Sequence, residues 1–162
     1  MHLKLKTLVV NGVVAALYIA VTFFIQPLAF MNIQFRVSEI FNHLVVFNKK
    51  YMIGIVLGVF LSNLFFSPIK YDMFIGTAQS VLALAITILS ARFIKGVWGQ
   101  MILNSIAFTA SMFIIAWEMQ WFNGVPFFFG WLTAGAGELA VMLIGMPVIY
   151  LINKRLHFEK QV

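Results

Sequence analysis

Six apolar stretches divide this chain, and the polar segments that separate them alternate in charge. The stretches cover approximately residues 7–30, 38–48, 51–69, 73–91, 96–117 and 128–152. At about 1.5 Å per residue, five of them can cross a hydrocarbon core about 30 Å thick, whereas 38–48 is expected to form a short or tilted helix. The pattern predicts an all-α integral membrane protein: a single membrane-embedded domain over residues 1–162, built as a bundle of six transmembrane helices.

The distribution of basic residues predicts the orientation of this bundle. Nine of the eleven Lys and Arg residues fall in segments on one predicted side of the membrane, and only Arg36 and Lys70 lie on the other. Short loops rich in Lys and Arg stay in the cytoplasm. We therefore expect six crossings with both termini cytoplasmic. The nine residues are Lys4, Lys6, Lys49, Lys50, Arg92, Lys95, Lys154, Arg155 and Lys160.

Composition and charge exclude several classes of protein. With 62% hydrophobic and 10% charged residues, the chain has too few charges to cover the surface of a soluble domain. The predicted inner side carries a net charge of +8 and the outer side −2, so the overall +6 reflects topology and attraction to anionic lipid rather than nucleic-acid binding. An acidic outer end favours a neutral or cationic ligand. The absence of cysteine excludes disulfides and thiol catalysis.

The outer connections are longer and more varied than the brief basic turns on the inner side. The longest is the amphipathic segment 27–37, which carries Asn32, Gln34 and Arg36 and is expected to fold over or into the bundle from outside. The segments 67–72 and 118–127 form the other two. Because binding residues are often carried on loops that a rigid scaffold positions, the working end is predicted at the outer face.

Glu138 is the most informative single residue. It lies about ten residues inside the last apolar stretch, next to Gly137. An ionisable group at that depth costs about 2.5–3.5 kcal/mol even on lenient insertion scales, so it indicates a functional site. The alternatives are a buried partner for Arg36, or a protonated carboxyl bonded to a backbone carbonyl.

A second acid approaches the same pocket from the neighbouring helix. Glu118 ends the fifth stretch between Trp117 and Trp121, and Trp131 follows across the connecting loop. Carboxylates can accept paired hydrogen bonds from an N–H edge, and aromatic rings can stack on a flat heterocycle. The sequence thus favours a nitrogen-rich planar ligand, although an interfacial aromatic belt is the alternative explanation for the tryptophans.

Five further polar residues lie within or next to the apolar stretches. Asp72 either caps the helix that it begins or contacts a ligand. Arg36 and Glu39 are three residues apart and are expected to pair with each other. Asn63 lies within a span, where an amide either bonds across helices or meets a ligand, and Asn104, nearer the inner end, is interpreted as structural. No histidine has metal-ligand spacing, so no metal site is expected.

The chain lacks the common sequence motifs of ATPases and of hydrolytic enzymes. It contains no G-x-x-x-x-G-K-[ST] phosphate loop, no H-E-x-x-H metal motif and no G-x-S-x-G nucleophile elbow. Six predicted spans also give little evidence of the paired repeats that stand-alone carriers use. We therefore predict a non-enzymatic, cofactor-free binding subunit of a larger machine.

Small residues recur at every fourth position in two of the stretches. Such a ladder flattens one face of a helix and lets another helix approach closely. Each ladder either packs inside this bundle or forms a docking face for a separate membrane subunit. The first ladder is Gly12, Ala16 and Ala20, and the second is Gly54, Gly58 and Ser62.

The string Ile33-Gln34-Phe35-Arg36-Val37-Ser38-Glu39, which follows Pro27, resembles the queuosine-precursor family of substrate-binding S components of energy-coupling factor (ECF) transporters. Family members often carry Gly-Pro where this chain has Met31-Asn32. The likeness covers nearly the whole chain and continues through Asn63, Ser67-Pro68, Asp72, Phe74-Ile75-Gly76, Asn104, Glu118, Pro126-Phe127, Gly137-Glu138 and Gly145-x-Pro147.

The resemblance implies a six-helix S component in a bacterial cell membrane that captures a deazaguanine-type base from outside. Its partners would be a transmembrane coupling subunit and two cytoplasmic ATPase subunits, and the ladder Gly12, Ala16 and Ala20 would contact the coupling subunit. In such transporters the S component topples within the membrane to carry its ligand inward.

The roles expected within this site follow from the chemistry of the base. Glu138 or Glu118 accepts hydrogen bonds from the guanine-like edge, Trp117 or Trp131 stacks on the ring, and Asp72 or Glu39 meets an aminomethyl cation. Gln34, Arg36 and Asn63 complete the predicted site. Two alternatives stay open: an S component for another vitamin-like heterocycle, and an autonomous carrier that uses Glu138 as a proton relay.

Overall fold

The computed structural model describes residues 2–31 and 33–162, with side chains from residue 5 onward; Asn32 lies outside the described residues. Within these ranges the chain forms helices and connecting loops and contains no β-strand. The elements in chain order are α1 (His2–Phe24), α2 (Gln26–Ala29), η1 (Val37–His43), α3 (Leu44–Phe47), η2 (Lys49–Tyr51), α4 (Met52–Phe66), α5 (Asp72–Ser90), α6 (Val97–Asn123), α7 (Phe127–Leu156) and η3 (Phe158–Lys160).

The prediction of an all-helical, multi-pass architecture is confirmed for five helices. In the described chain, the segments long and apolar enough to cross a membrane are Leu5–Phe24, Lys49–Phe66, Asp72–Ser90, Val97–Asn123 and Phe127–Leu156. The stretch 38–48, expected to form a short or tilted helix, corresponds to Val37–Phe47, a shorter apolar unit of η1 and α3. A six-span count and the orientation of the termini therefore stay predictions.

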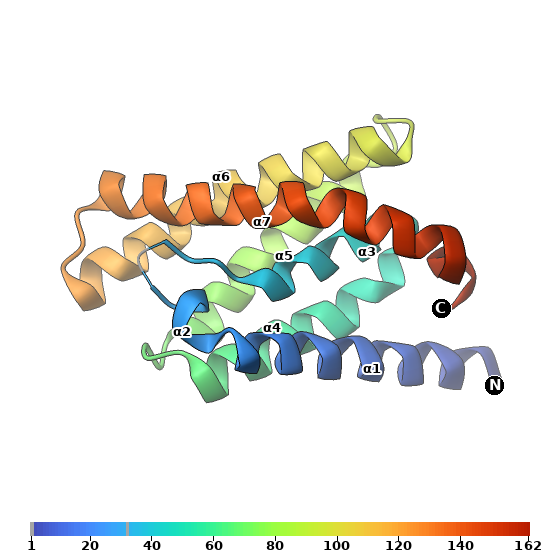
Figure 1. Ribbon diagram of the computed structural model, residues 1–162, viewed down its shortest axis with the longest axis horizontal. Coiled ribbons are helices and arrows are strands. Elements are labelled where there is room, and N and C mark those ends of the chain that lie inside the picture. The colour runs from blue at the N-terminus through green and yellow to red at the C-terminus, as the bar shows by residue number, and fades with distance from the viewer. Residues whose placement is uncertain (1, 32) are drawn as a thin grey trace.

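The segment from residue 33 to 48 runs along the inside of the bundle, between α1 and α7 (Figure 1). At one end, Gln34 Nε2 lies 3.8 Å from Met119 Sδ, near the C-terminus of α6. At the other, Asn48 Nδ2 donates to the Val162 carbonyl oxygen at 3.3 Å. Both chain termini lie at this second end (Figure 1). The segment thus links the end that carries the termini to the predicted binding end.

Buried polar side chains on this segment are bonded to the surrounding helices. His43 Nε2 donates to the Met142 carbonyl oxygen at 2.9 Å, and Asn104 Nδ2 donates to His43 Nδ1 at 3.2 Å. Thr87 Oγ1 in turn donates to Asn104 Oδ1 at 2.8 Å. Because polar groups inside a bilayer must find partners within the protein, this network fixes the segment against α5, α6 and α7. Asn104 has the structural role expected of it.

The second small-residue ladder packs inside the bundle, between α4 and α1. The backbone N–H of Gly54 donates to Asn11 Oδ1 at 2.7 Å. A Cβ added to Gly58 would lie only 2.7 Å from Tyr18 Cβ. Ser62, the third member, is buried as well. This ladder lets two helices approach more closely than larger side chains permit.

The first ladder lies on the outside of α1. Gly12, Ala16 and Ala20 are all exposed, and no heavy atom lies within 4 Å of a Cβ built on Gly12. The interpretation that this ladder packs within the bundle is therefore wrong, because the opposite side of α1 faces α4. A flat strip of small residues is left on the outer surface of the protein.

The two ladders predict different responses to the same substitution. We expect Gly58→Ala to lower the free energy of unfolding by about 1–3 kcal/mol, because the added methyl group overpacks against Tyr18. Gly12→Ala is the matched control, since it gains the same helix propensity in open space. Thermal unfolding of both variants in detergent measures the difference. Equal transition temperatures would contradict the packing described for α1 and α4.

Candidate functional site

A buried ion pair joins the inner segment to the start of α5, at the end of the bundle away from the termini. Arg36 Nη2 lies 3.2 Å from Asp72 Oδ2, and both side chains are only 4% exposed. Asn63 Nδ2 donates to the Asp72 carbonyl oxygen at 3.1 Å. A Cβ on Gly76 would lie 2.6 Å from the same Asn63 nitrogen. Asn63 therefore positions the ion pair, and it does not line the neighbouring pocket.

Glu39 does not pair with Arg36 as the sequence predicted. Tyr18 Oη donates to Glu39 Oε1 at 2.8 Å, and Asn42 Nδ2 donates to Glu39 Oε2. The spacing rule fails because Arg36 precedes η1 with non-helical backbone angles (φ −81°, ψ 75°), so the two side chains do not share a helix face. Glu39 is fully buried and both of its oxygens have partners.

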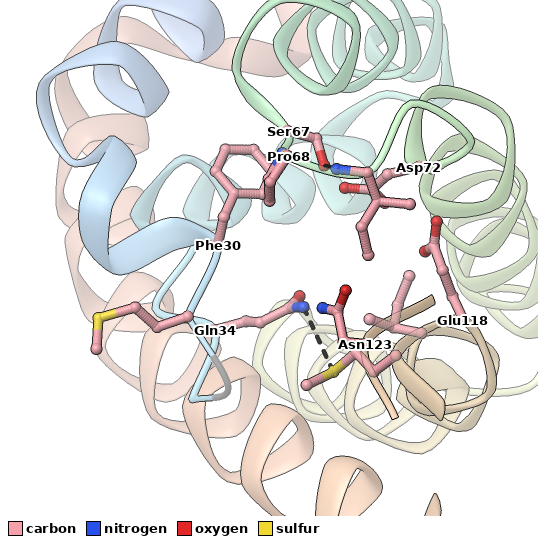
Figure 2. A pocket seen from close by; sticks show the side chains of 11 residues that line it. Phe30, Gln34, Ser67, Pro68, Asp72, Glu118 and Asn123 are labelled. Carbon is pink, nitrogen blue, oxygen red and sulfur yellow. Dashed lines mark hydrogen bonds between the residues drawn. The ribbon is translucent and has the colours of Figure 1, made fainter. Parts of the chain in front are cut away.

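A narrow pocket opens beside Asp72 (Figure 2). Its wall combines residues 30, 31 and 34 of the outer segment, the connection between α4 and α5, and the last turns of α6. The cavity volume of about 20 Å³ is enough for roughly one water molecule, which needs about 10–15 Å³. The lining residues are Phe30, Met31, Gln34, Ser67, Pro68, Ile69, Asp72, Ile115, Glu118, Met119 and Asn123.

Gln34 occupies much of this space. Its side chain extends across the pocket toward Asn123, and its amide contacts Met119 Sδ (Figure 2). Its backbone packs on α7, where a Cβ added to Gly137 would lie 2.9 Å from the Gln34 carbonyl oxygen. Glycine at 137 thus allows the outer segment to lie directly on α7, next to Glu138. Displacement of Gln34 would enlarge the pocket.

Glu138 is completely buried, and neither of its carboxyl oxygens has a hydrogen-bond partner in the described chain. Neither alternative raised by the sequence occurs: Arg36 is paired with Asp72, and no backbone carbonyl accepts a hydrogen bond from Glu138. Leaving a buried polar group unpaired costs about 1–3 kcal/mol, and more for a charged one. Such atoms in a folded protein require an explanation.

The unpaired polar atoms concentrate around the pocket and the inner segment. They include Gln34 Oε1, Arg36 Nε, Asp72 Oδ1, Glu118 Oε1 and both oxygens of Glu138. Acceptors outnumber donors in this set, and Arg36 is the single buried cation against four carboxyl groups in the part of the chain that the structure describes. The arrangement therefore suits a ligand rich in N–H donors, with or without a positive charge.

The tryptophans lie elsewhere. Trp117 is 55% exposed and packs beside Trp121, while Trp131 is 37% exposed and contacts Phe113 and Phe127. Neither Trp117 nor Trp131 lines the pocket. Consecutive helical residues point about 100° apart, so burying the carboxyl of Glu118 turns its neighbour outward. The interfacial-belt interpretation fits these positions, and the predicted stacking role does not.

The aromatic ring that does line the pocket is Phe30, which sequence reasoning missed. Its ring also lies 5.4 Å from the guanidinium carbon of Arg36. Asn123 was missed too, although it ends the same helix as Glu118 and lies in an outer connection. The available signal was proximity to Gln34 and Glu118 in sequence, but nothing in the apolar pattern distinguished Phe30 from its many neighbours of similar character.

Comparison with known proteins identifies the family. A family model described as QueT transporter matches residues 8–154. The chain belongs to the QueT transporter family. It is 32% identical over 166 positions to the queuosine precursor transporter QueT of Lactococcus lactis subsp. cremoris (strain MG1363), covering 97% of this chain and 98% of that protein. No solved structure matches the chain.

Family membership confirms the resemblance to a queuosine-precursor transporter family that the string around Arg36 carries. Together with the five long apolar helices, it establishes a multi-pass membrane transport protein. A transporter family is also consistent with the prediction that the chain is not an enzyme.

The ion pair can be tested through stability. Asp72→Asn leaves the Arg36 charge buried without its partner, and we expect it to lower the free energy of unfolding by about 3–5 kcal/mol. Glu159→Gln is the control, because it removes one carboxylate from an exposed pair with His157 and should cost less than about 1 kcal/mol. Denaturant unfolding in detergent measures both. Similar small effects in the two variants would show that the buried pair is not required for the fold.

Proposed function

We propose that this chain is the substrate-binding S component of an ECF-type transporter and captures a deazaguanine-type queuosine precursor from outside the cell. Three findings support the proposal: membership of the QueT transporter family, similarity to a Lactococcus protein named as a queuosine precursor transporter, and a buried acidic site at the predicted outer end. The observation that carries the site assignment is the unpaired carboxyl group of Glu138.

The chemistry of a guanine-like edge matches this carboxyl group. Such an edge presents neighbouring N–H donors, and one carboxylate can accept two parallel hydrogen bonds from them. Glu138 has both oxygens free for this purpose. Gln34, whose amide oxygen is also unpaired, offers an acceptor and two donors beside it. Phe30 provides an aromatic face at the pocket wall.

Besides Glu138, the proposed site contains two further acidic residues, Asp72 and Glu118. Each retains one unpaired oxygen at the pocket, whereas both oxygens of Glu39 are bonded to Tyr18 and Asn42. An aminomethyl group on the base would bring a positive charge to these oxygens. We therefore place the cation of an aminomethyl-deazaguanine beside Asp72 and Glu118, and we expect this form to bind more tightly than its nitrile relative.

Entry of the base requires the outer segment to move. A bicyclic base does not fit a cavity of about 20 Å³. The contact that holds Gln34 across the pocket is a 3.8 Å amide–sulfur interaction. It is weak compared with the buried ion pair between Arg36 and Asp72. We propose that Phe30, Met31 and Gln34 move away while Arg36 stays paired with Asp72, and that this movement joins the pocket to Glu138.

In the proposed transporter, which lies in a bacterial cell membrane, uptake is driven by ATP hydrolysis in two cytoplasmic ATPase subunits. A transmembrane coupling subunit connects them to this chain. The exposed strip of Gly12, Ala16 and Ala20 is the proposed docking face for the coupling subunit. It is flat and lies on the side of α1 away from α4. The rival is an autonomous carrier in which Glu138 relays protons.

Glu138→Gln tests the site directly. The substitution removes the charge with little change in volume, and we expect affinity for aminomethyl-deazaguanine to fall about 10- to 100-fold, the loss of hydrogen bonds to a charged acceptor. Calorimetric titration of the detergent-purified protein measures it, with guanine and thiamine as ligand controls. Glu159→Gln, at the far end of the bundle, is the matched control variant.

Three outcomes of that titration are decisive. Normal affinity in Glu138→Gln would remove Glu138 from the site. Tight binding of thiamine instead of the deazaguanine would favour the S component for another heterocycle. Equal affinity for the aminomethyl and nitrile bases would contradict the cation-binding role of Asp72 and Glu118 while leaving the base assignment intact.

The docking face is tested by uptake rather than binding. We expect Ala16→Leu to leave affinity for the base unchanged and to abolish most ATP-driven uptake in cells that supply the coupling and ATPase subunits, because a bulky side chain prevents close helix approach. Ala78→Leu, on the exposed side of α5, is the control. Full uptake in Ala16→Leu, or uptake driven by a pH gradient in liposomes that contain this chain alone, would contradict the proposal.

A further inference from the structure

An apolar groove runs along the outer surface of α4 and α5, remote from the site described above. Its α4 wall is formed by Met52, Ile53, Leu57 and Phe60, and Val81 contributes from α5. Ile53 is 64% and Leu57 45% exposed, so the groove is open to the surroundings of the bundle. Its volume is about 570 Å³, far larger than the closed pocket at the other end.

The length of the groove corresponds to one leaflet of a membrane. Along α4 it extends from Lys49 to Phe60. At about 1.5 Å per residue, this distance is roughly 17 Å, close to half of a hydrocarbon core about 30 Å thick. An acyl chain that begins at the membrane interface would therefore fill the groove from its mouth to the middle of the bilayer.

The mouth of the groove carries two positive charges that have no ion-pair partner among the described residues. Lys49 and Lys50 line it, and both are exposed. The ion pairs within the described residues involve neither lysine. Both also lie at the N-terminal end of α4, where the helix dipole favours an anion rather than a cation. A phosphate group placed there would meet both ammonium groups and the positive end of the helix.

A second apolar groove provides an internal comparison. It lies between α6 and α7, has a similar volume of about 510 Å³, and is lined by residues that include Ile106, Trp131 and Leu139. No basic residue contributes to its lining. The basic mouth thus distinguishes the groove on α4 and α5 and determines the charge of the occupant that fits it.

We propose that the groove on α4 and α5 is a binding site for one anionic phospholipid. An acyl chain lies along Ile53, Leu57 and Phe60, and the headgroup phosphate lies between Lys49 and Lys50. This site is separate from that of the proposed transport substrate, because the groove and the pocket share no lining residue, and Lys49 and Lys50 lie at the opposite end of α4 from the Asn63–Asp72 contact.

Native mass spectrometry of the detergent-purified chain tests the proposal with phosphatidylglycerol and phosphatidylcholine of identical acyl chains. We expect one phosphatidylglycerol to be retained in preference to phosphatidylcholine. Lys49→Gln with Lys50→Gln should weaken phosphatidylglycerol binding about 30-fold, the effect of two basic contacts with an anionic headgroup. Leu57→Trp should weaken the binding of both lipids by filling the groove.

Arg92→Gln with Lys95→Gln is the matched control, because it removes two exposed charges from another basic loop and should change binding less than about twofold. Circular dichroism checks that each variant is folded. Equal loss in the two double variants would show diffuse attraction to charge and overturn the site. Equal retention of the two lipids by the unmodified chain, or no effect of Leu57→Trp, would overturn it as well.

Discussion

The buried pair between Arg36 and Asp72 is the interaction on which the binding end depends. It ties a segment that is neither a full span nor a surface loop to the first turn of α5. Inside a bilayer, the backbone and charges of such a segment are tolerated only when the protein itself satisfies them. Among the described residues, the pair neutralises the one buried cation at this end and fixes the position of Arg36.

The rest of the inner segment, residues 37–48, is held by polar contacts with the surrounding helices. Ser38 bonds to Thr22 at 2.8 Å, Glu39 to Tyr18, and His43 to Asn104. The side chains of Ser38, Glu39 and His43 have partners, although Asn42 Oδ1 has none, whereas toward the pocket several acceptors lack partners. On this difference rests our proposal that Glu39, with both oxygens bonded, belongs to the scaffold, and that Glu138, with both oxygens unpaired, belongs to the binding site.

Small residues perform two distinct tasks in this architecture. Gly58 and Gly137 allow close approach within the bundle, to Tyr18 and to the Gln34 backbone respectively. Gly12, with its open surroundings, keeps the outer face of α1 flat. Close approach within the bundle positions the segment that carries Gln34. The flat outer face of α1 is the surface that we propose as the docking face for a coupling subunit.

The sequence by itself determined the helical membrane class, the segregation of charge and the presence of an ionisable residue, Glu138, deep in an apolar stretch, because these follow from hydropathy, loop composition and residue position. It also carried the family resemblance in the residues around Arg36. Only the tertiary structure decided that Arg36 pairs with Asp72 and not Glu39, that Trp117 faces away from the pocket, and which glycine ladder is internal. These outcomes depend on the rotation of each helix about its axis and on the non-helical backbone before η1. Hydropathy does not predict helix rotation in a chain that is apolar on nearly every helix face, because lipid and protein core accept the same side chains.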